Sequence, residues 1–214
     1  MTHGLEKETI FKQAFQRVLE QTTGAVLRES REAAFKFFNE NGLPTTHDEE
    51  WKYTNVAALP ISDFEVVISN SAVIGDVSEY LKGFKFDRNG FTALNAAFSN
   101  VVLVTIPKET SVAEPIELLF RADPQTSNFP YYVIIAEAGS KATIVETYES
   151  DSASFTNAAI QIFVDENANL THYRVQKESA DAFHVGTTEV TLKRGSLYDA
   201  TSINLGAKLS RNDI

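Results

Sequence analysis

Cysteine is absent from this chain of 214 residues, which also contains only one tryptophan, one methionine and six prolines. Without thiols the chain can form no disulfide, no Cys-type zinc site and no thiol nucleophile, and it offers no cysteine ligand to an iron–sulfur cluster. The absence is typical of a reducing compartment, and the cytoplasm is the compartment we expect.

Basic residues are scarce. The 19 lysines and arginines face 29 aspartates and glutamates, which gives a net charge of −10 and a pI near 4.9. The longest basic run is Lys193-Arg194, which we assign to a solvated turn. A chain of this charge without a basic patch is not expected to bind nucleic acid.

Long apolar runs are missing as well. The N-terminus carries charges where a signal peptide needs an apolar segment, and no stretch reaches the roughly 18 apolar residues of a membrane span. The sequence also contains no GxGxxG, GxxxxGKS/T, HExxH or GxSxG motif. We therefore expect no membrane insertion and no nucleotide site on this chain.

The first 60 residues predict a small helical domain. Apolar residues recur at helical spacing over residues 6–20 and again over 26–38, and Gly42 and Pro44 end the second pattern. The two sets are Ile10, Phe11, Ala14, Phe15, Val18 and Leu19, then Val26, Leu27, Ala33, Ala34, Phe37 and Phe38. Residues 61–100 read as a mixed α/β connector, with a strand at 64–69 and short helices at 76–83 and 91–99.

From residue 101 the chain predicts strands only. Short runs rich in Val, Ile, Thr, Tyr and Phe recur without helical segments between them. The runs are VVLVTI, PIELLF, YYVIIA, ATIVETY, AIQIFV, LTHYRVQ, TEVTL and LYDATSINL.

These runs repeat at a nearly constant period. Thr110, Gly139, Ala168 and Gly195 occupy comparable turns, with spacings of 29 (110 to 139), 29 (139 to 168) and 27 (168 to 195) residues. A period of this length indicates a solenoid, here a β-helix over residues 101–214. A β-sandwich of regular hairpins is the alternative. The polar run SINLGAKLSRNDI has no capping helix, so we expect a chain truncated before its C-terminal part and prone to homo-oligomerise.

Candidate site residues in the strand region are few. His172 and His184 lie on different predicted strands, and a metal site would need a third ligand from Asp181 or Glu189. We favour surface or turn positions for both histidines. The acidic residues of the region occur singly, as on a solvated rim: Glu137, Glu146, Glu149, Asp151, Asp165, Glu166 and Asp199. We therefore assign no catalytic, cofactor or metal residue.

The single tryptophan lies in a short polar segment, GLPTTHDEEWKYTNV, at residues 42–56. Thr46 and Glu49 have the spacing of a capping box that would start a short helix before Trp51. We expect Trp51 to anchor this connector to the helical hairpin rather than to form an exposed stacking platform.

This segment closely resembles the N-terminal signature of SufD proteins, in the SufB/SufD family of the SUF iron–sulfur cluster assembly machinery. The likeness continues in LNAAFS, IVETYES, THYRVQKES and LGAKLSRNDI, in the same order, from about residue 30 to the end. SufB proteins share the β-helix half but typically begin differently, often with a cysteine-bearing region. The absence of cysteine and the Trp-Lys-Tyr-Thr run therefore favour SufD.

The resemblance implies a helical N-terminal domain, a right-handed parallel β-helix and a C-terminal helical domain. It also implies a complex with a SufB-like subunit and a SufC-like ATPase, the latter bound through the missing C-terminal part. The cluster would be handled by that complex and not by this chain alone. We expect a non-catalytic SufD-like assembly subunit, with a SufB-like cluster scaffold or a β-helix carbohydrate-active enzyme as alternatives.

Overall fold

The computed structural model describes residues 2–57, 59–68, 80 and 83–214, and within these ranges the side chains of residues 2–10 and Ser62 are not described. The helical elements are α1 (Thr2–Gln21), α2 (Ala25–Asn41), η1 (Glu49–Trp51), η2 (Ile61–Asp63), η3 (Phe86–Arg88) and α4 (Gly90–Phe98). The strands are β1 (Glu65–Val66), β2 (Asn100–Ile106), β3 (Ile116–Arg121), β4 (Thr126–Asn128), β5 (Pro130–Ala136), β6 (Lys141–Glu149), β7 (Phe155–Val164), β8 (Asn169–Lys177), β9 (Phe183–Leu192), β10 (Leu197–Asn204) and β11 (Leu209–Asp213).

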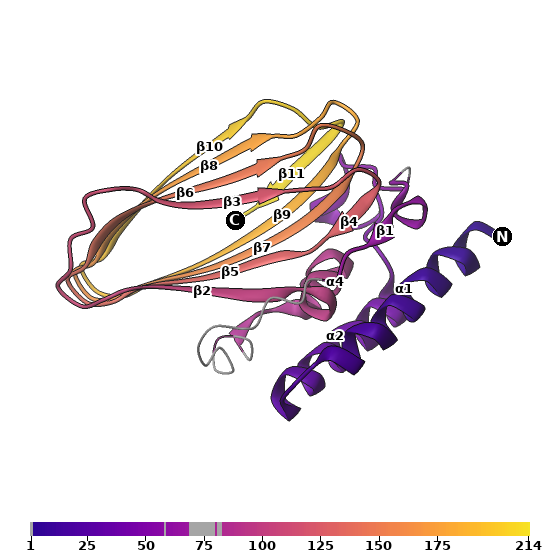
Figure 1. Cartoon of the computed structure of the whole chain (residues 1–214), viewed down its shortest axis with the longest axis horizontal. Helices are drawn as coiled ribbons and strands as arrows, with labels where there is room; N and C mark the ends of the chain where they lie inside the picture. The colour runs from indigo at the N-terminus through magenta and orange to yellow at the C-terminus, as the bar shows by residue number, and fades with distance from the viewer. Residues whose placement is uncertain (1, 58, 69–79, 81–82) are drawn as a thin grey trace.

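The strands form two facing sheets, and from β5 to β11 each successive strand crosses to the other sheet (Figure 1). The larger sheet holds β2, β5, β7, β9 and β11 together with the short β1 and β4, and the smaller has the order β10-β8-β6-β3. We call one strand from each sheet, with the turn joining them, a rung. Every strand pair of the described residues is parallel. This confirms the predicted β-solenoid and excludes the sandwich of antiparallel hairpins.

Alternation of side chains decides what lies between the sheets. Along β6 the burial alternates residue by residue, so Ala142 and Ile144 point inward while Thr143 and Val145 point outward. Strand β7 is buried at nearly every position because a layer formed by helices α1, α2 and α4, called the helical layer, covers its second face. The solenoid core consists of Ile106, Tyr132, Ile134, Ala136, Ala142, Ile144, Ile160, Ile162, Val164, Ala168 and Leu170.

The tight turns at one end of the solenoid repeat a left-handed backbone position. Glu109, Gly139, Asn167 and Gly195 have φ angles of 57°, 68°, 56° and 70°. The amide of Gly139 donates to the carbonyl of Glu166 in the next turn, and the amide of Asn167 donates to that of Arg194. The sequence alignment of the turns was therefore wrong by one residue at Thr110 and Ala168. Ala168 is fully buried in the core because it follows the left-handed residue.

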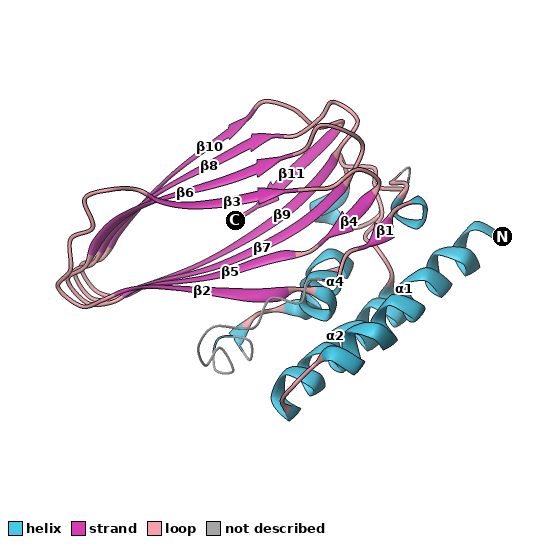
Figure 2. Ribbon diagram, viewed as in Figure 1, coloured by secondary structure: helices cyan, strands magenta, loops and turns pink. Residues whose placement is uncertain are grey.

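The helical layer covers the outer face of the larger sheet (Figure 2). Phe15 of α1 stacks on Phe35 of α2 with ring centroids 4.0 Å apart, and Phe98 of α4 packs against both. The two predicted helices are confirmed, although Ala33 is exposed and Phe35 takes the buried position.

Helix α4 joins the helical layer to the solenoid. Asn89 and Thr92 form a capping box at its start, which confirms a helix over the predicted range 91–99. Within α4, Asn95 Nδ2 donates to the carbonyl of Asn157 on β7 at 2.7 Å. Asn157 Nδ2 donates back to the carbonyl of Phe91 at 2.7 Å. These reciprocal bonds fix the angle at which the helix lies on the sheet.

The connector prediction has a mixed outcome. The strand expected at 64–69 is reduced to β1, and most of the helix expected at 76–83 lies outside the described residues. Strands β4 and β11 were not predicted, and the polar run at the end contains β11, paired with β9. The boundaries at residues 60 and 100 remain predictions. No helix in the described part of the chain is both long and apolar enough to cross a membrane.

Candidate functional site

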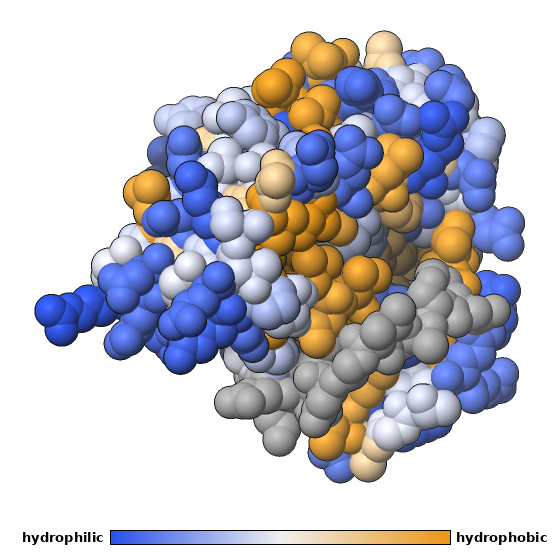
Figure 3. All heavy atoms as spheres, turned by 60° about the vertical axis from the view of Figure 1, so that its left-hand side comes forward, coloured by the Kyte–Doolittle hydropathy of each residue, from blue (hydrophilic) through white to orange (hydrophobic). Residues whose placement is uncertain are grey.

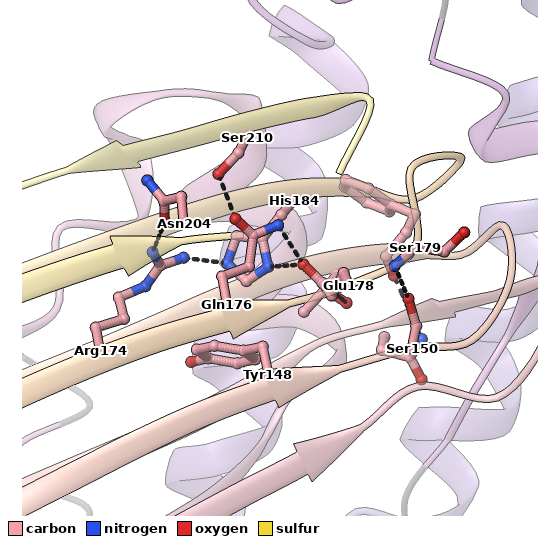
Figure 4. Close-up of polar contacts among 12 residues, drawn as sticks. Tyr148, Ser150, Arg174, Gln176, Glu178, Ser179, His184, Asn204 and Ser210 are labelled. Carbon is pink, nitrogen blue, oxygen red and sulfur yellow. Dashed lines mark hydrogen bonds and ion pairs between the residues drawn. The ribbon is translucent and has the colours of Figure 1, made fainter. Parts of the chain in front are cut away.

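A network of polar side chains lies between the two sheets, where the core above would lead us to expect apolar residues (Figure 4). The inward-facing positions of β6 and β8 carry Glu146, Tyr148, His172, Arg174 and Gln176 after the apolar start of each strand. None of these five residues is more than 4% exposed. Buried polar groups of this kind are stable only when they are hydrogen-bonded to one another.

One branch of the network centres on His172. Its Nε2 lies 3.0 Å from Glu146 Oε2, and its Nδ1 lies 2.8 Å from the hydroxyl of Tyr198 on β10. The hydroxyl of Tyr148 donates to the other oxygen of Glu146. The branch therefore runs from the half-buried Tyr198 to the fully buried Tyr148 and ties β6, β8 and β10 together.

A second branch centres on His184 of β9 and connects the two sheets. His184 Nδ1 lies 2.8 Å from Glu178 Oε2, and His184 Nε2 lies 2.5 Å from Arg174 Nη2. Glu178 also accepts hydrogen bonds from Thr156 Oγ1 at 2.7 Å and from Gln176 Nε2 at 2.8 Å. The carboxylate of Glu178 is thus surrounded by three donors.

Arg174 extends this branch to β10. Its Nη1 lies 3.2 Å from Asn204 Oδ1 and 3.4 Å from Ser202 Oγ. Its guanidinium also lies over the ring of Tyr148, 5.4 Å from the centroid. Arg174 therefore places a positive charge between the two branches.

The two buried carboxylates stay ionised in this setting. Burial alone would raise the pKa of Glu146, but the contacts with His172, the hydrogen bond from Tyr148 and the charge of Arg174 outweigh it and lower the pKa. The same balance between burial and the contacts from His184, Thr156 and Gln176 lowers the pKa of Glu178. Burial lowers the pKa of His184, so this imidazole is neutral.

The site residues considered from the sequence fall into two groups. His172 and His184 are buried on strands, 3% and 0% exposed, so the preferred interpretation as surface or turn histidines was wrong. Glu146 is buried, which contradicts its placement on a solvated rim. The other acidic residues of that set are exposed or half-buried: Glu137, Glu149, Asp151, Asp165, Glu166 and Asp199.

Asp181 and Glu189, the candidate third metal ligands, form no three-ligand group with His172 or His184. Asp181 is exposed in the loop before β9, and Glu189 instead accepts a hydrogen bond from Gln161 at 3.2 Å. Across the described residues, no three His, Cys, Asp or Glu side chains are grouped so as to hold a metal ion. The geometry is that of a hydrogen-bonding network in which each buried histidine is paired with a glutamate.

The alternation of side chains along β6 and β8 is the sequence signal that indicates this network. Ala142, Ile144, Glu146 and Tyr148 share one parity on β6, so an inward-facing Ile144 already places Glu146 inside. The same rule applies to Leu170, His172 and Arg174 on β8. Glu178 carried no such signal because it lies in a loop.

Trp51 is anchored, as predicted, but through different partners. It is 2% exposed, and its ring stacks on Phe91 of α4 with centroids 5.0 Å apart. The guanidinium of Arg211 lies 4.0 Å from the Trp51 ring centroid, and its Nη1 donates to Thr54 Oγ1 at 3.1 Å. We call these contacts of Trp51, Thr54 and Arg211 the clasp.

The predicted capping box of Thr46 and Glu49 does not form. Asp48 is the residue before η1, and its carboxylate accepts from the amide of Thr45 at 2.6 Å. Hydrogen bonds from the backbone amide of Thr45 and from its hydroxyl lower the pKa of Asp48. A single 3₁₀ turn has no room for the reciprocal box, because Glu49 is already its first residue.

An apolar cavity of about 220 Å³ lies beside the first rung. Its walls include Val102 of β2, Phe120 of β3 and Tyr132 of β5. Apolar side chains also gather near the middle of one face of the molecule (Figure 3).

Comparison with known proteins gives consistent matches. The model of the SufBD protein N-terminal region matches residues 6–84, and that of the SufBD core domain of SUF-system FeS cluster assembly matches residues 119–214. An iron–sulfur cluster assembly SufBD family protein of Synechocystis is 26% identical over 93% of this chain and 58% of its own length.

Two further relatives are similar to this chain. The iron–sulfur cluster assembly protein SufD of Escherichia coli is 22% identical over 80% of this chain and 51% of its own length. Protein ABCI7, chloroplastic, of Arabidopsis thaliana is 24% identical over 64% of this chain and 31% of its own length. The chain thus spans between about a third and three fifths of the length of these relatives.

Proposed function

This chain belongs to the SufB/SufD family of the SUF iron–sulfur cluster assembly system, and we propose that it acts there as a SufD-like, non-catalytic scaffold subunit. The observation that carries the proposal is the match of both family models, in order, to the helical layer and the parallel solenoid. A rigid solenoid suits a subunit that presents fixed surfaces to other proteins.

The SufD-like assignment, in preference to a SufB-like one, rests on sequence features. The chain has no cysteine to ligate a cluster, and it carries the Trp-Lys-Tyr-Thr run at residues 51–54. That run forms part of the clasp, since both Trp51 and Thr54 contact Arg211. The E. coli relative named SufD supports the same choice.

We further propose that a SufB-like subunit and a SufC-like ATPase are its partners, and that the cluster is cargo of the assembled complex. The buried polar network supports a structural role, because each of its two carboxylates already has a histidine partner. The cytoplasm remains the compartment that we expect from the sequence.

Co-expression with the SufB-like and SufC-like proteins of the same genome tests these proposals. We expect the chain to co-purify with the SufB-like subunit, and the purified chain alone to show neither ATPase activity nor an iron–sulfur chromophore after anaerobic reconstitution. A cluster that reconstitutes stoichiometrically on the chain alone would favour the SufB-like scaffold instead. ATP hydrolysis by the chain alone would contradict the non-catalytic assignment.

A further inference from the structure

The contact between Arg174 and His184 fixes the protonation of the imidazole. A guanidinium has only N–H donors, so the 2.5 Å contact of Arg174 Nη2 requires an unprotonated His184 Nε2 as the acceptor. The proton of the neutral ring therefore lies on Nδ1, which donates to Glu178 at 2.8 Å. The donors from Thr156 and Gln176 keep Glu178 in its accepting, ionised form.

A second acceptor borders the same space at Gly186. Asn212 Oδ1 of β11 is buried without a hydrogen-bond partner. A Cβ built on Gly186 would lie 2.7 Å from Asn212 Oδ1, 3.3 Å from Arg174 Nη2 and 3.4 Å from His184 Nε2. All three polar atoms therefore converge on the space that the missing side chain of Gly186 leaves open.

Protonation of His184 is incompatible with the present position of Arg174. A proton on Nε2 would point at the guanidinium across 2.5 Å, so that two donors and two positive charges would face each other. Asn212 Oδ1 borders the same space at Gly186, and a small shift of its side chain or of the ring would let it accept the new N–H, which would satisfy a buried oxygen that is otherwise unpaired.

We propose that His184 is a proton-operated latch, which holds Arg174 when neutral and exchanges it for Asn212 when protonated. Arg174 Nη1 bonds to Ser202 and Asn204, so release of Arg174 removes its two side-chain hydrogen bonds to β10. The backbone ladder between β8 and β10 still pairs after the exchange but opens more readily, because β10 has lost these side-chain bonds. Acidification thus loosens β10 without unfolding the solenoid.

The groups around His184 come from every strand packed against it. Arg174 of β8 opposes its protonation, and Glu178 of the β8–β9 loop and Glu146 of β6 favour it. Tyr148 of β6 contributes a ring 4.7 Å away, and Thr156 of β7 lies beside His184 in the strand ladder and donates to Glu178. Because burial outweighs the carboxylates, the transition lies below the ordinary histidine pKa of about 6.5.

Nitrogen-15 NMR of the histidine rings tests the first step. At pH 8 we expect His184 to be the Nδ1–H tautomer, with an unprotonated Nε2. A His184 ring that carries its proton on Nε2 at this pH would overturn the proposal.

Hydrogen exchange tests the consequence. Protection factors, corrected for intrinsic exchange, should fall about tenfold in β10 as the pH is lowered from about 7.5 through the His184 transition, which the nitrogen-15 shifts locate. They should stay constant in β6, because only β10 loses charge-assisted bonds. His184→Gln should abolish the change, whereas His47→Gln, at an exposed histidine, should retain it. Loss of the change in His172→Gln but not in His184→Gln would assign the transition to the other branch and refute the latch.

Asn212→Ala separates the latch from a purely structural role. Removal of an acceptor without a partner should leave β10 protection at pH 7.5 unchanged and shift the transition to lower pH, since the protonated ring loses its alternative partner. An unshifted transition in Asn212→Ala would overturn the exchange of partners.

Discussion

Replacement of Trp51 by alanine measures how much the clasp contributes to stability. The indole is 2% exposed and stacks on Phe91 with ring centroids 5.0 Å apart. The guanidinium of Arg211 lies over the indole, 4.0 Å from the ring centroid. Truncation of a buried aromatic side chain costs about 3–5 kcal/mol because it removes apolar burial and leaves a cavity. We expect Trp51→Ala to lower the free energy of unfolding by this amount.

Urea unfolding followed by far-UV circular dichroism is the appropriate assay, because the variant has no tryptophan to report by fluorescence. With an m-value of about 3 kcal/mol/M, the expected loss lowers the midpoint by about 1–1.7 M. In the unsubstituted chain, Trp51 fluorescence should be blue-shifted and poorly quenched by acrylamide.

Tyr53 supplies the matched control. It is an aromatic residue two positions away and 94% exposed, so Tyr53→Ala should change stability by no more than about 0.5 kcal/mol. A native-like Trp51→Ala protein that loses less than about 1 kcal/mol would refute the anchor. A double-mutant cycle with Arg211→Met should give a coupling of about 0.5–2 kcal/mol for the cation–π contact.

Three further changes probe the turn, the helix contact and the buried network. Gly139→Val should lower the thermal midpoint because φ is 68°, whereas Gly139→Asn should be tolerated as Asn167 is; equal effects would contradict this. Gly90→Ala should lower the free energy of unfolding in urea, although alanine is the better helix former, because its Cβ would lie 2.0 Å from the carbonyl oxygen of Gly42; a stabilised variant would disprove the contact. Glu146→Gln should cost about 3 kcal/mol at pH 7, and since the folded pKa is lowered, the difference should shrink as pH falls below about 4.3. A difference that is the same at pH 7 and pH 3.5 would show that ionisation is not involved.

The solenoid could be predicted because its signals are local. Runs of β-branched residues and turns at a constant period follow from strand length and from the left-handed residue at each turn. The turn register was wrong by one residue at Ala168, because Asn167 can adopt the same φ as glycine and leaves no compositional mark.

The buried network was missed for a different reason. Polar residues such as Glu146 and His172 were taken as exposed by type, although strand parity with Ile144 and Leu170 places them inside. Their stability depends on partners from other strands, such as Tyr198, and no single strand reveals that pairing. Strand β11 was missed because its sequence, LSRND, lacks the β-branched and aromatic residues that mark the other strands.

The clasp also sets an order of events during synthesis. Thr54 and Arg211 are 157 positions apart in the chain, so the ribosome must add all the intervening rungs before the contact can form. At about 5–20 residues per second, that takes about 8–30 s. Phe91 is synthesised early in this interval and Arg211 only at its end, so until β11 is made the indole of Trp51 lacks its guanidinium neighbour and the nascent chain carries an incompletely covered aromatic surface that chaperones can bind.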